Sequence, residues 1–212
     1  MKLLALIVFC GTAFIAAAEP SALTDNDWPT ANPSGPPSIK TFENYSAKDL
    51  ISFIIDTSGT AEWHENKFTA CAQFLWLTRD SKDGVELRTQ LAESIFKKLD
   101  TAENPHDIAT LAGFLGPLHA RTQVIALLSK LKAVDCCYGP ALIHALAECG
   151  NIDDAPLLIA CFDKETEISG GMSHAALVQL TKFNPLPDAH WPYNRAQAKA
   201  LWTQWLKERK SN

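Results

Sequence analysis

The chain has 212 residues, of which 47% are hydrophobic and 20% are charged, and its formal net charge is −5 at pH 7. This apolar content is enough for one sizeable core, so a single folded unit is expected. The charges form neither long like-sign runs nor a basic excess, which argues against DNA or RNA as a partner and against a polybasic membrane anchor.

Residues 1–18 have the three-part build of a secretory signal peptide, with Lys2, an apolar run from Leu3 to Ile15, and small residues before an expected cleavage at Glu19. A membrane-spanning helix is the alternative interpretation, but the run is short for one. We therefore expect an exported protein, periplasmic or secreted, with no stable membrane insertion after cleavage. Residues 19–43 are rich in proline and are expected to form a disordered linker.

From residue 44 onward the apolar residues recur at helical spacing, and no segment alternates over the length of a strand. An all-α domain is therefore predicted over residues 44–212. Start signals include Ser46 with Asp49 three residues later, and Asn104 followed by Pro105. The expected helices cover about 46–58, 62–77, 85–99, 105–115, 119–132, 140–149, 154–162, 172–183 and 194–207.

Several local features of these helices can be predicted as well. Gly150 is expected to end the sixth helix in a left-handed cap, and Asp153 with Asp154 is expected to cap the seventh. A turn-rich insertion over 184–193 separates the last two helices. The second helix carries an apolar stripe of Phe68, Cys71, Ala72, Leu75 and Trp76.

One register recurs along the middle of the chain at a period of 33 residues. The segments 88–91 and 121–124 read Arg-Thr-Gln-Leu and Arg-Thr-Gln-Val, and Leu157 follows after another 33 residues. Ile95, Leu128 and Cys161 repeat the same step. A fixed period of this length is typical of stacked helical repeats.

The run from His144 to Leu158 combines an apolar helix, a Gly turn, an acidic cap and a second apolar helix. It resembles the short HEAT-like repeat, the kind also seen in phycobilisome lyases, and the resemblance covers roughly 105 to 182. It implies a short right-handed α-solenoid of antiparallel helix pairs, an armadillo-type fold. Because the family consists chiefly of binding scaffolds, the resemblance also implies a protein partner rather than a reaction.

Four polar residues are the candidate partner-binding positions. Arg88 with Gln90, and Arg121 with Gln123, occupy equivalent places in successive repeats. If these residues follow one another along the inner face of the stack, they provide a contact surface, since solenoids usually bind there. The alternative is that they form an ordinary solvated helix face.

The C-terminal tryptophans are expected to close the array. Trp202 and Trp205 lie on the last helix and follow Trp191 and Tyr193 in the turn-rich insertion. Since a helical stack must cover its ends, we interpret Trp202 and Trp205 as a structural cap. An aromatic shelf for a sugar or a peptide is the alternative.

The cysteines are the remaining candidates for chemistry. If the sixth and seventh helices fold back at 150–153, Cys137 approaches Cys161, so an exported chain is expected to form this disulfide. The cysteine and histidine spacings match no zinc motif and no nucleophile–base signature, so we predict no metal, no cofactor and no catalytic residue. The expected function is a non-catalytic protein-binding scaffold. The alternative is an enzyme or lyase-like chaperone that uses an exposed cysteine.

Overall fold

The computed structural model of the chain describes residues 42–134, 137–165, 171–186 and 194–211. These residues form nine α-helices and one short 3-10 helix, and their only β-type pairing is an isolated bridge between Val134 and Glu165. The prediction of an all-α protein is confirmed for this part of the chain. The predicted signal peptide, most of the predicted linker and most of the turn-rich insertion lie outside the described residues.

Every predicted helix within this part of the chain is present, and α10 extends to Ser211 rather than to 207. The elements are α2 (Ala47–Asp56), α3 (Ala61–Thr78), α4 (Gly84–Leu99), α5 (Pro105–Phe114), α6 (Arg121–Lys130), α7 (Tyr138–Cys149), the 3-10 helix η1 (Ile152–Asp154), α8 (Ala155–Cys161), α9 (Met172–Thr181) and α10 (Arg195–Ser211).

Local capping explains where several of these helices begin. Ser46 accepts a hydrogen bond from the N–H of Asp49, whose carboxylate accepts one from the N–H of Ser46, so the predicted capping box is present. At α5, Asn104 accepts from the N–H of His106, and Pro105 occupies the first turn, where no hydrogen bond from its nitrogen is needed. Both starts were predictable because they depend on neighbouring residues alone.

For the turn between α7 and α8, the prediction for Gly150 was wrong and the prediction for the acidic cap holds only in part. Gly150 is extended, with φ of −80° and ψ of −178°, instead of left-handed. Glycine is required there for space, since a Cβ atom would lie 2.4 Å from the carbonyl oxygen of Leu146. Asn151 and Asp154 form a capping box at η1, whereas Asp154, which is the N-cap residue of α8, makes no side-chain cap hydrogen bond to α8 itself.

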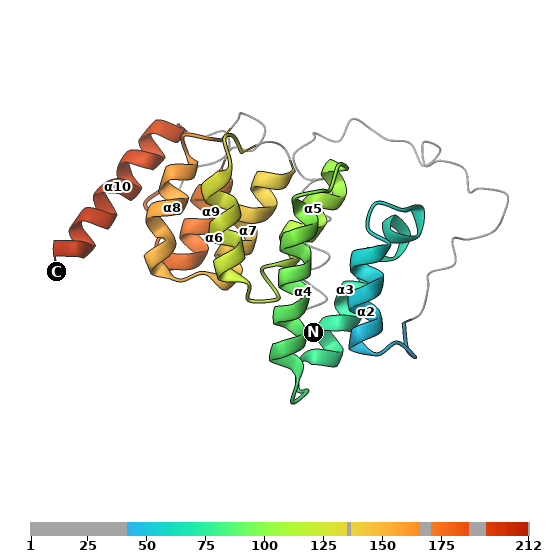
Figure 1. The fold of residues 1–212 in the computed structure, drawn as a ribbon. Coiled ribbons are helices and arrows are strands. Elements are labelled where there is room, and N and C mark those ends of the chain that lie inside the picture. Colours follow the sequence, from blue (N-terminus) through green and yellow to red (C-terminus); the bar gives the residue numbers. More distant parts are fainter. Residues whose placement is uncertain (1–41, 135–136, 166–170, 187–193, 212) are drawn as a thin grey trace, which may run out of the picture.

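The helices pack mainly on their neighbours along the chain and on the next helix but one. α2 pairs with α3, α6 with α7, and α8 with α9, while α7 also packs on α5 and α9, and the most extensive contact joins α5 to α7. Figure 1 shows the helices following one another in chain order, from α2 and α3 near one end to α10 at the other. This arrangement brings residues about one period apart into contact.

The apolar positions that recur at the 33-residue step all lie on α4, α6 or α8. Ile95, Leu128 and Cys161 are fully buried. Leu91 and Val124 are fully buried too, whereas Leu157 is half-buried and packs against the core. Positions 33 residues apart are therefore buried or half-buried on α4, α6 and α8, which alternate along the chain with α5 and α7.

Aromatic side chains gather where α9 is followed by α10. Trp202 is fully buried, and its indole N–H donates to Nδ1 of His174 at 3.0 Å. Its ring lies edge-on to Trp205 at 5.5 Å between centroids, and Phe183 contacts both tryptophans at 6.0 and 6.1 Å. Ring contacts with Phe183 and a hydrogen bond to His174 thus hold α10 against the end of α9.

Candidate functional site

Arg121, one of the predicted partner-binding residues, is engaged within the chain. Its Nε and Nη2 atoms donate to the two carboxylate oxygens of Asp154 at 2.7 and 2.6 Å. Asp154 lies 33 residues later, is only 5% exposed, and also accepts from the N–H of Asn151 at 2.8 Å. This bidentate pair joins the start of α6 to the start of α8, across 33 residues of sequence.

The charge state of Asp154 follows from these contacts. Burial by itself raises the pKa of this carboxyl, but the hydrogen bonds from Arg121 and Asn151 and the positive charge of Arg121 together hold the pKa below its usual value. Asp154 is therefore ionised at neutral pH. A charged carboxylate at this depth depends on its arginine partner.

The other predicted contact residues remain at the surface. Arg88 and Gln123 are half-exposed, and Gln90 is exposed. One period after Arg88 stands Arg121 instead of an acid, so the ion pair of α6 and α8 has no equivalent between α4 and α6. The structure gives these three residues no defined binding geometry, and their role in partner binding stays a prediction.

The predicted disulfide is not formed in this structure. Cys161 carries a free thiol and is fully buried. The loop before α7 does lie against the end of α8, since the N–H of Val134 donates to the carbonyl of Lys164 at 2.7 Å. The predicted proximity of the two loops is therefore present without the covalent bond. Cys136 lies outside the described residues.

None of the four described cysteines is exposed. Burial raises the pKa of Cys71, and it raises the pKa values of Cys149 and Cys161 to about 11. A nucleophilic cysteine needs the opposite shift, because the thiolate is the reactive form. These three thiols consequently do not have the properties of a catalytic nucleophile.

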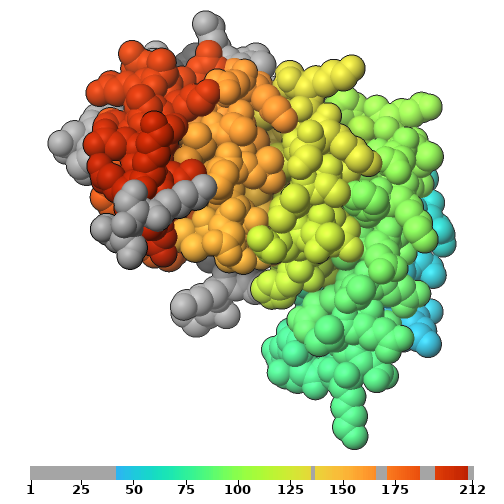
Figure 2. Space-filling model, turned by 60° about the vertical axis from the view of Figure 1, so that its left-hand side comes forward, coloured from blue at the N-terminus to red at the C-terminus, as the bar shows by residue number. Residues whose placement is uncertain are grey.

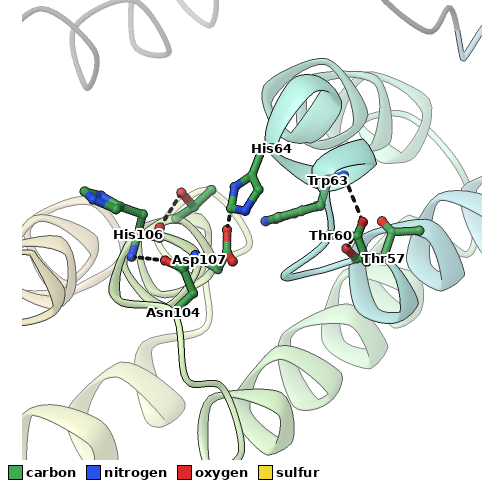
Figure 3. A network of polar contacts seen from close by, with 8 residues as sticks. Thr57, Thr60, Trp63, His64, Asn104, His106 and Asp107 are labelled. Atoms are coloured by element: carbon green, nitrogen blue, oxygen red, sulfur yellow. Dashed lines mark hydrogen bonds and ion pairs between the residues drawn. The ribbon is translucent and has the colours of Figure 1, made fainter.

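A polar cluster joins the start of α3 to the start of α5, as Figure 3 shows. His64 is 39% exposed, and its Nδ1 atom lies 3.2 Å from a carboxylate oxygen of Asp107, whose side chain is 3% exposed. This contact has ion-pair distance but not hydrogen-bond geometry, since neither oxygen of Asp107 accepts a hydrogen bond from any described residue. The buried indole N–H of Trp63 also has no acceptor among them.

An imidazole held by a carboxylate can act as a base when a hydroxyl or thiol lies beyond it. The two threonines drawn beside this cluster do not fill that role. Thr57 donates its hydroxyl proton to the carbonyl of Phe53 and Thr60 donates to the carbonyl of Thr57, so both protons are already used in the turn between α2 and α3. The cluster therefore links two helices and has no nucleophile assigned to it.

Glu148 and His144 lie one turn apart on α7, and Glu148 faces the turn after α5. Glu148 is half-buried against Gly116, where a Cβ atom would come within 2.3 Å of its Oε2 atom. Burial raises the pKa of Glu148 to about 7, and burial lowers the pKa of His144. Their nearest side-chain atoms are 3.9 Å apart. This carboxyl thus exchanges its proton near neutral pH.

The outward side of α3 differs most from the sequence prediction. Phe68 and Trp76 were assigned to the apolar stripe of this helix, yet they are 49% and 53% exposed. Cys71 and Leu75 of the same stripe are buried as predicted, and the core is also contacted by Trp63, Ala70 and Phe74, which are all fully buried. Apolar residues surround α3 on nearly all sides, so helical spacing alone did not determine which side faces the core.

Cations lie over both exposed rings. Nζ of Lys67 is 5.4 Å from the centroid of the Phe68 ring, and the guanidinium carbon of Arg79 is 4.9 Å from the Trp76 ring. In Figure 2 the teal and green segment around the end of α3 and the start of α4 projects from the rest of the molecule. We define the α3 outer face as Glu65, Phe68, Ala72, Trp76 and Arg79, which share one side of the helix.

A polar groove of about 1030 Å³ separates the end of α8 from α10. Its charged residues mainly contact groups within the chain: Nζ of Lys199 lies 2.5 Å from both carboxylate oxygens of Asp163, and Arg195 donates to the carbonyl of Glu165. The groove therefore offers little uncompensated charge to a ligand.

Comparisons with known proteins find no matching family model, no similar curated protein and no similar solved structure. Within the described residues, no three histidine, cysteine or acidic side chains are grouped so that they can hold a metal ion. The helices of that same part include none that is both long and apolar enough to cross a membrane. The assignment of function therefore depends on the surfaces described above.

Proposed function

We propose that the chain is an exported, non-catalytic scaffold of stacked HEAT-like helix pairs that binds a protein partner. The proposed contact surface is the α3 outer face, in place of the inner-face arginines expected from the sequence. The single observation that carries this choice is the exposure of Phe68 and Trp76, at 49% and 53%, on a helix whose opposite side is fully buried.

Two observations support the solenoid arrangement. The buried set Ile95, Leu128 and Cys161 recurs at the sequence period, and the ion pair between Arg121 and Asp154 spans that same 33-residue interval. Stacked repeats bury equivalent positions against the next repeat, which accounts for both. The contacts of Trp202 and Trp205 with Phe183 support a closing role for α10.

The α3 outer face has the composition of a binding hot spot. Tryptophan and arginine are enriched among the residues that dominate protein interfaces, and Trp76 with Arg79 supplies both. Covering the exposed halves of the two rings removes on the order of 200 Å² of apolar surface from water, or about 5 kcal/mol before the costs of association. A partner therefore gains more here than over the half-exposed Arg88.

The alternative of an enzyme or lyase-like chaperone with an exposed cysteine has less support. Burial raises the pKa of Cys71, Cys149 and Cys161, which keeps these thiols protonated at neutral pH. The His64–Asp107 pair has no nucleophile assigned to it. A binding role requires neither.

The test compares two surfaces of one chain. Wild type, Phe68→Ser/Trp76→Ser and Arg88→Glu/Gln90→Glu are immobilised and exposed to the exported proteins of the source, and captured proteins are identified and then titrated in purified form. We expect Phe68→Ser/Trp76→Ser to weaken binding at least tenfold while Arg88→Glu/Gln90→Glu leaves it unchanged. Loss of binding in the second variant alone would overturn the assignment to α3, and a thiol-dependent product from any captured molecule would overturn the non-catalytic role.

A further inference from the structure

We infer that the partner at the α3 outer face is a second copy of this chain, whose α3 packs antiparallel to the first. This inference rests on the proposed function, because it names the occupant of the same surface. Its basis is a symmetry in the residues that share that side of the helix. Ala72 lies at the centre, Phe68 and Trp76 are four residues away on either side, and Glu65 and Arg79 are seven residues away.

Steps of four and seven residues keep side chains on one side of an α-helix. Arg79 directly follows α3 but retains helical dihedral angles, with φ of −59° and ψ of −45°, so its side chain continues the same line. Glu65 is exposed and the Arg79 side chain is 58% exposed. Four of the five positions are therefore exposed along one side of α3, and the half-buried Ala72 lies between them.

In a symmetric dimer, if one residue contacts a second across the interface, the second also contacts the first. Antiparallel pairing about Ala72 places Phe68 beside Trp76 of the other copy, and it does so twice. It also places Glu65 beside Arg79 of the other copy, which gives two ion pairs between opposite charges. The small side chain of Ala72 lies at the crossing point, where it lets the helices approach closely.

The charges select this orientation over the parallel one. Parallel pairing brings Glu65 against Glu65 and Arg79 against Arg79, so both ends of the interface repel. Among the described residues, Arg79 forms an ion pair with the neighbouring Asp80 at 2.8 Å, and the Asp80 side chain is 83% exposed. An ion pair in such exposed surroundings is weak and leaves Arg79 able to bridge to another copy.

A chemically asymmetric partner would not require this pattern. A surface for an unrelated protein has no reason to carry an acid and a base at equal distances on either side of two aromatic rings. The pattern is instead complementary to itself. Because the interface consists of one helix pair, it is at the small end of specific interfaces, and we expect a dissociation constant on the order of micromolar.

The experiment uses charge reversal and sedimentation velocity of the full chain over a range of concentrations. Wild type should change from monomer to dimer as concentration rises. Glu65→Arg alone and Arg79→Glu alone should each weaken dimerisation at least tenfold. An equimolar mixture of these two variants should recover dimers, because each copy then offers charges opposite to those of the other. The double variant Glu65→Arg/Arg79→Glu should also dimerise.

Glu93→Arg is the matched control, since Glu93 is exposed on α4 and the charge change is the same. Circular dichroism verifies that each variant keeps its helices. A wild type that stays monomeric throughout, or a mixture that fails to recover dimers, would overturn the inference about the second copy. If wild type stays monomeric but binds a different captured protein, and Phe68→Ser/Trp76→Ser weakens that binding, the proposed function stands without the dimer. Failure of the dimer is therefore distinguishable from failure of the proposed function.

Discussion

Two tryptophans, one on α10 and one on α3, are buried to very different extents. On α10, Trp202 is fully buried and contacts Trp205 and Phe183, although Phe183 is itself 42% exposed. On α3, Phe68 and Trp76 are about half exposed, and a cation lies over each ring. Aromatic content alone therefore does not determine whether a tryptophan is buried. What decides is whether the chain supplies further residues to pack over the rings.

Replacing one tryptophan on each helix should give the largest difference. Trp202→Ala leaves a cavity and removes the indole donor to His174, so we expect a loss of about 3–5 kcal/mol in the free energy of unfolding. Trp76→Ala changes an exposed side chain and should cost less than about 1 kcal/mol. Urea denaturation of both variants measures the difference. Equal losses would contradict this difference between the two tryptophans.

The ion pair between Arg121 and Asp154 extends the comparison to the middle of the chain. Arg121→Ala leaves the buried Asp154 without its cation, and we expect a clear loss in the free energy of unfolding at neutral pH. Arg88→Ala is the matched control at the equivalent position, with an expected change below about 0.5 kcal/mol.

The pH dependence gives an independent check on the same pair. Because Asp154 has a lowered pKa in the folded state, its contribution is present above the ordinary value of 3.8 and is lost as pH falls through the folded value. Arg121→Ala should therefore lose less stability on acidification than wild type does. A wild-type acid response in the variant would contradict the role of the pair.

Glu148 should make one junction sensitive to pH in the opposite direction. Its pKa is about 7 in the folded chain and 4.5 in an ordinary environment, so folding favours the protonated form. The stabilisation is complete below pH 4.5 and is lost as pH rises to 7, by about 2–3 kcal/mol. Glu148→Gln should remove this decline. Unfolding free energies at pH 5 and pH 8 provide the measurement, and equal slopes for both chains would refute it.

Thiol labelling compares α3 with α8 in the unsubstituted chain, and the expected difference in labelling rate is the smallest effect. Cys71 lies on α3 and is 7% exposed, whereas Cys161 at the end of α8 is fully buried. In native buffer we expect both to react slowly, and in urea below the unfolding midpoint Cys71 should react first because α3 is less covered. Mass spectrometry without reductant records the order. A mass that lacks label at Cys137 and Cys161 after full unfolding would instead indicate their disulfide.

Much of the fold was predictable because helix starts depend on local chemistry. Ser46 with Asp49, and Asn104 with Pro105, identified two starts from residues that contact each other directly. The recurrent buried positions on α4 and α6 were predictable from the 33-residue period. The end of α7 was not, because the extended Gly150 is set by its approach to Leu146 and not by a preference of glycine for positive φ.

The candidate sites were harder to predict because they depend on which side of a helix faces the core. Phe68 and Trp76 fit an apolar stripe in the sequence, and only the packing of Trp63 and Phe74 places them outside. Arg121 was assigned to the surface although Asp154 follows it at the repeat interval. Searching for opposite charges one period apart would have found that pair.

The bidentate contact between Arg121 and Asp154 also bears on how the molecule opens. If α6 moves away from α8, the Asp154 carboxylate loses its partner Arg121, so the two helices should separate together. Their amides should therefore exchange with deuterium through one shared opening event. The first helices lack such a link to α6 and should exchange earlier. Native-state exchange would then divide the chain into a faster N-terminal unit and a slower cooperative unit from α6 to α8.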